Sequence, residues 1–174
     1  MASEESSLNN FGIVIAYVLP GFTALHGFPL YPPGQAAWGT GGDPNPTLTT
    51  FLSGTVMALA AGLTVSAVRW LVIDRLHGWT GLRHPVRDFA RLERSVAALE
   101  YLDVVHYRYY KFYANMVVAL VWIYATRDYV LGWRGAIYLP LVALFFLASR
   151  DALAKFYARS GELLGPAGRV VTPD

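Results

Sequence analysis

The sequence predicts an all-α integral membrane protein with four transmembrane helices. Apolar residues make up 55% of the 174 residues, whereas charged residues make up only 15%, too few to cover a soluble domain of this length. Four apolar runs alternate with polar or Pro- and Gly-rich sequence. Lys and Arg gather between the second and third runs and after the fourth. These observations predict a single membrane domain over residues 1–174.

The chain contains no cysteine, which excludes disulfides, thiolate metal ligands and thiol redox chemistry. Its first ten residues carry Glu4 and Glu5 but no Lys or Arg. A secretory signal peptide begins with positive charge, so we interpret the first apolar run as a retained helix.

The first predicted span covers residues 11–28, barely enough to cross a hydrocarbon core of about 30 Å. Pro20 and Gly21 interrupt it and predict a kink that neighbouring helices would tolerate. Residues 29–47 are dense in Pro and Gly and lack Lys and Arg, which predicts an outer loop.

The second predicted span covers residues 48–73 and is the clearest of the four. Its only charge is Arg69, near its end, which we expect to reach the headgroups. The length of the run implies a tilt or an extension beyond the lipid.

Residues 74–109 change in character and are predicted to form a cytoplasmic segment. Gly78, Gly81 and Pro85 indicate a turn, after which apolar residues recur every three or four positions. This pattern predicts a basic amphipathic helix that could lie on an anionic leaflet or pack against a partner. The residues predicted to contact lipid or a cytosolic anionic ligand are Arg87, Arg91, Arg94, Arg108 and Lys111.

The third and fourth spans are predicted at 110–126 and 130–149, followed by a polar tail over 150–174. The third run is short, but the tyrosines, Arg and Lys of residues 107–113 resemble an aromatic belt at headgroup level. Pro140 predicts a kink in the fourth span.

Charge predicts the orientation. Of 14 Lys and Arg residues, eight lie between Arg69 and Lys111 and four follow Ser149. The positive-inside rule places both segments in the cytoplasm, and four spans then place the N-terminus there too. We expect a location in the bacterial inner membrane.

Small residues recur every fourth position in the second span. Gly54, Ala58, Gly62 and Ser66 form a ladder that lets two helices approach closely in lipid. Two interpretations stay open: the ladder packs against the first or fourth span, or it serves self-association.

Asn115 is an amide inside the third predicted span, and a buried amide there needs a hydrogen-bond partner. It lies one turn from the tyrosine belt. A structural role is therefore favoured over a functional one.

A cytoplasmic polar site is a further hypothesis. Asp74 and His77 resemble an acid-base pair at a helix end, and Glu100, Asp103 and His106 follow one another at intervals of three. Three such groups could ligate a metal, but histidines are few, and a solvated acidic patch is favoured. We predict no metal and no cofactor.

The leading functional hypothesis is a non-enzymatic, self-associating membrane module. One version is a pore or ion-channel type effector gated from the cytoplasm, for example in bacterial antiviral defence, an analogy based on general architecture alone. The alternatives are an accessory subunit of a larger membrane complex and a membrane-embedded enzyme that modifies lipid or isoprenoid. The expected partners are the bilayer, a second copy or another membrane subunit, and a cytosolic anionic ligand or protein.

Overall fold

The computed structural model describes residues 12, 14–27, 48–86, 88, 90, 92–126 and 133–165. Every regular element within this part of the chain is a helix, which confirms the all-α prediction. The predicted outer loop 29–47 and the last residues of the tail, 166–174, lie outside the described ranges.

The first helix begins with a π-helical turn, η1 (Val14–Val18), and continues as α2 (Leu19–Leu25). Pro20 lies in the first turn of α2, directly after η1, so it offers no N–H to the carbonyls of that preceding turn. At the position of the kink predicted from Pro20 and Gly21, the helix changes from π-helical to α-helical winding.

The second helix, α3 (Leu48–Trp79), begins where the sequence predicts but ends six residues later. Gly78, expected to lie in a turn, is helical. The chain turns instead at Gly81, whose φ of 93° suits glycine. Leu82 N–H donates to the carbonyl of His77 (3.2 Å) and thereby closes the end of the helix.

The segment predicted as a separate cytoplasmic helix is part of a longer one. α4 (Leu92–Leu102), the π-helical segment η3 (Asp103–Tyr107) and α5 (Arg108–Thr126) follow one another without a break. The last helix, α6 (Trp133–Leu164), continues through Pro140 and extends fifteen residues past the predicted end at 149. Most of the predicted polar tail that the structure describes is therefore helical.

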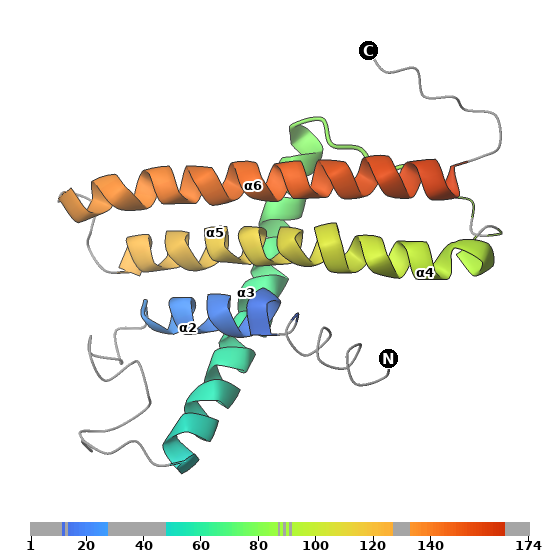
Figure 1. Ribbon diagram of the computed structural model, residues 1–174. Coiled ribbons are helices and arrows are strands. Elements are labelled where there is room, and N and C mark those ends of the chain that lie inside the picture. The colour runs from blue at the N-terminus through green and yellow to red at the C-terminus, as the bar shows by residue number, and fades with distance from the viewer. Residues whose placement is uncertain are drawn as a thin grey trace.

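Figure 1 shows α6, the α4–α5 helix and α2 side by side in one layer, with α3 crossing behind them. The main core lies where α3, α5 and α6 meet, and it contains Ile73, Tyr110, Ala114, Val117, Ala152 and Leu153. Alanines at this crossing let the helix backbones approach closely.

Within the residues that the structure describes, two helices are long and apolar enough to cross a membrane, α3 over Phe51–Trp79 and α6 over Ala136–Leu164. Only 28% of the most apolar stretch of α3 is buried within the chain, and only 17% of that of α6. Most of the apolar surface of these two helices is therefore uncovered. The first helix is apolar but short, and α5 does not meet the same criterion. A membrane location is thus supported by two helices, and four spans stay a prediction.

Candidate functional site

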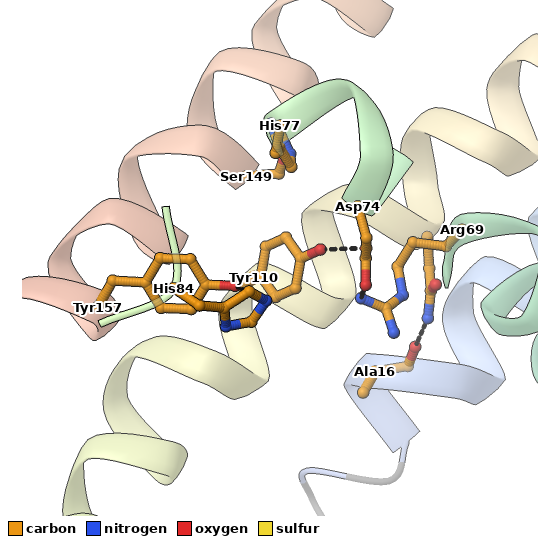
Figure 2. Close-up of polar contacts among 9 residues, drawn as sticks. Ala16, Arg69, Asp74, His77, His84, Tyr110, Ser149 and Tyr157 are labelled. Carbon is orange, nitrogen blue, oxygen red and sulfur yellow. Dashed lines mark hydrogen bonds and ion pairs between the residues drawn. The ribbon is translucent and has the colours of Figure 1, made fainter. Parts of the chain in front are cut away.

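An ion pair between a buried Arg69 and a half-buried Asp74 lies where α3 meets α5. Arg69 is only 6% exposed, and its Nη1 lies 3.1 Å from Asp74 Oδ1. Tyr110 of α5 donates its hydroxyl to the same carboxylate, and the Arg69 guanidinium lies 5.2 Å from the centre of the Tyr110 ring (Figure 2). Arg69 therefore binds inside the protein and does not extend toward headgroups as expected.

His77 joins α3 to α6 one turn further along. Its Nε2 lies 3.0 Å from Ser149 Oγ, and its ring stacks on Phe146 at 4.9 Å between centroids. His77 and Ser149 are both fully buried. The sequence singled out His77, but nothing local to it points to Ser149, which is 72 residues away.

A cavity of about 380 Å³ opens beside these contacts, between the end of α3, the start of α5 and the C-terminal half of α6. Its polar lining residues are Asp74, His77, His84 and Asp103. Three of the five polar residues singled out in the sequence thus share one cavity. Figure 2 shows His84 beside Tyr157, whose hydroxyl lies 3.0 Å from His84 Nε2, and both residues line the cavity together with Tyr110.

The other two residues of that hypothesis lie elsewhere. Glu100 is exposed on α4, and His106 of η3 accepts a hydrogen bond from Arg159 Nη1 of α6 (2.8 Å). Desolvation, followed by the charges of Arg159 and Lys155, lowers the pKa of His106, which favours the neutral acceptor. Among the described residues, no three His, Asp or Glu side chains are grouped as metal ligands.

The small-residue ladder of α3 faces the first helix. Gly54, Ala58 and Gly62 are buried and Ser66 is half-buried. A Cβ on Gly62 would meet the backbone carbonyl of Tyr17 in η1, and one on Gly21 would meet the backbone of Ala58. A second copy could use this face only by displacing the first helix.

Asn115 is fully buried on α5, and its Nδ2 donates to the carbonyl of Ala16 in η1 (2.7 Å). The amide therefore links the first helix to α5 by a hydrogen bond within the chain.

Replacing Asn115 by leucine should destabilise the fold by about 1 kcal/mol, because the Ala16 carbonyl loses its side-chain donor. Thermal unfolding of the purified protein in detergent micelles measures the change. Leucine at the exposed, neighbouring Val121 is the control, and equal melting temperatures for the two variants would contradict the role of the amide.

The basic residues predicted to contact an anionic ligand are only partly described. Arg87 and Arg91 lie outside the described residues, as does the side chain of Arg94. Arg108 lies against Gly12 near the start of the first helix, and Lys111 Nζ lies 4.4 Å from the centre of the Tyr107 ring. These two cations thus make contacts within the chain.

The cavity combines carboxylates, imidazoles and phenols at the junction of three helices. Such a lining can bind a small polar group and orient it by hydrogen bonds. Comparison of the chain with protein-family models, with curated proteins and with solved structures finds no match.

Proposed function

We propose that the protein is a non-enzymatic membrane module that associates with a second copy of itself. The observation that supports this proposal is the uncovered apolar surface of α3 and α6, on which large side chains such as Phe51, Trp70, Leu144 and Leu147 are exposed. Surface of this kind requires lipid or another apolar helix as its neighbour.

The open face of α3 offers a place for the second copy. Ala60, Thr64 and Ala67 are exposed on it, about half a turn from the ladder that the first helix covers. Thr64 donates its hydroxyl to the carbonyl of Ala60 (3.0 Å), so the face presents few polar atoms. Small residues three and four positions apart permit two copies of α3 to cross closely.

Cysteine crosslinking in membranes tests this face, and the absence of native cysteine makes the background clean. We expect Ala60→Cys to give a crosslinked dimer, whereas Ala143→Cys, exposed on α6, should give little. Adding Ala67→Leu to Ala60→Cys should reduce the yield, because the larger side chain holds the helices apart. Equal yields at both positions, or no effect of the leucine, would contradict the α3 interface.

We further propose that the assembly is a pore effector that is opened from the cytoplasm. The continuous α4–η3–α5 helix supports this proposal, because it links a helix rich in charge directly to the apolar bundle. The crosslinking preparation, reconstituted in liposomes, should release an encapsulated dye only while the α3 interface is intact. A monomer that gains order only with another membrane chain would favour the accessory-subunit alternative.

The enzyme alternative relies on the cavity. Asp74 is a poor candidate for a catalytic base, because its carboxylate already binds Arg69 and accepts from Tyr110. Contacts of this kind suit a structural carboxylate better than a reactive one. For this reason the non-enzymatic function is proposed here.

A further inference from the structure

The protonation of His77 can be assigned from its neighbours. The Ser149 hydroxyl donates its one proton to the carbonyl of Phe146 (2.8 Å), so its oxygen accepts from His77 Nε2–H. A neutral His77 then carries a lone pair on Nδ1. That nitrogen is buried and has no hydrogen-bond partner among the described residues, although His77 lines the cavity and is only 1% exposed. A ligand that donates an N–H or O–H would satisfy it.

The charges that line the cavity are negative. Asp74 and Asp103 contribute carboxylates, and no Lys or Arg belongs to its described lining. Arg69 offsets the charge of Asp74. Asp103 makes no hydrogen bond or ion pair within the described part of the chain, although its charge acts on Lys111. Its carboxylate therefore stays available to a cationic ligand.

Aromatic rings complete the wall of the cavity. Its lining includes Trp70, Tyr107, Tyr110, Phe156 and Tyr157. Two of these rings already lie against cations of the protein, Tyr110 against Arg69 and Tyr107 against Lys111. Aromatic faces attract a cation most strongly where water is excluded, so the buried Tyr110 should contribute more than Trp70, which is largely exposed.

We propose that this cavity binds an ammonium group that carries N–H donors. One donor would bond to His77 Nδ1 after a small shift of the side chains that cover this nitrogen. Asp103 would offset the charge, and the aromatic rings would surround the rest. The ammonium belongs either to an aminophospholipid headgroup or to a soluble primary amine. The proposal goes beyond the self-association proposed above, because the cavity lies within one chain.

Native mass spectrometry of the full-length protein in micelles that contain defined lipids tests the site. We expect retention of phosphatidylethanolamine about tenfold above phosphatidylcholine and phosphatidylglycerol, since only the first has a primary ammonium. Asp103→Asn should abolish the preference. Asp151→Asn, which removes an exposed carboxylate outside the cavity, should leave it unchanged.

Ethylammonium added to the same samples distinguishes the two sources. Displacement of the lipid, or binding of ethylammonium alone, supports a soluble amine, and lipid retention that resists it supports the headgroup. Equal retention of phosphatidylcholine would overturn the proposal, because its quaternary nitrogen donates no hydrogen bond. Equal losses in the two Asp variants, or no binding of any amine by the wild-type protein, would overturn it as well.

Discussion

Replacing Arg69 by methionine should lower the free energy of unfolding by about 2 kcal/mol. The guanidinium is buried and holds the Asp74 carboxylate, which also accepts from Tyr110. Without Arg69 that carboxylate, which is 31% exposed, would keep one neutral donor and partial access to water. The loss is therefore smaller than for a fully buried pair but larger than for one on the surface.

Chemical unfolding in detergent micelles measures this loss. Arg75→Met is the matched control, since Arg75 is exposed on the same helix and its replacement should change stability little. The double variant Arg69→Met with Asp74→Asn should recover part of the loss, because neither charge remains. If Arg69→Met and Arg75→Met unfold alike, the pair does not stabilise the junction of α3 and α5.

Replacing Gly62 by alanine should destabilise the protein by about 2–3 kcal/mol and loosen the first helix. The added Cβ would collide with the backbone carbonyl of Tyr17, and a backbone atom cannot move aside as a flexible side chain can. The first helix would have to shift from α3, which would also stretch the hydrogen bond from Asn115 to Ala16.

Gly78→Ala is the control on the same helix, because a Cβ there meets nothing within 4 Å. It should be neutral or stabilising by up to about 1 kcal/mol, since alanine favours helix over glycine. Thermal unfolding and proteolysis of the first helix both report the difference. A Gly62→Ala variant as stable as Gly78→Ala would show that the two helices are not in close contact.

Hydropathy predicts the existence of the helices well and their ends poorly. The start of α3 at Leu48 follows from the end of the Pro- and Gly-rich segment. Its end does not follow from Gly78, because packing of Ile73 and His77 against other helices stabilises the last turns. Tertiary packing of this kind overrides a local glycine signal.

The sequence contains a signal for the extension of α6 beyond residue 149. Arg150 and Asp151 suggest an end, yet Ala152, Leu153 and Leu164 continue a buried stripe at helical spacing. The helical periodicity of these residues therefore predicts a longer helix than mean hydropathy does. The short third run is likewise explained by its continuity with η3 and α4.

The candidate site could be predicted only as a set of residue types. Of the five residues predicted as a polar site, Asp74, His77 and Asp103 line one cavity, whereas Glu100 and His106 lie outside it. The partners that define the site come from distant parts of the chain. Tyr110 lies 36 residues from Asp74, and Ser149 lies 72 residues from His77. A single sequence carries no signal for such pairs when each partner is a common helical residue.

The π-helical segment η3 determines how the side chains of α4 are rotated about the helix axis relative to those of α5. A wide turn contains one residue more than an α turn, and each residue advances the side chains by about 100° around the axis. The extra residue therefore aims the outward side chains of α4 in a different direction from those of α5. Rewinding this turn as α-helix would rotate α4 about the helix axis relative to α5. The rotation would change which side chains of α4 contact α6, and the backbone of the long helix would stay hydrogen-bonded.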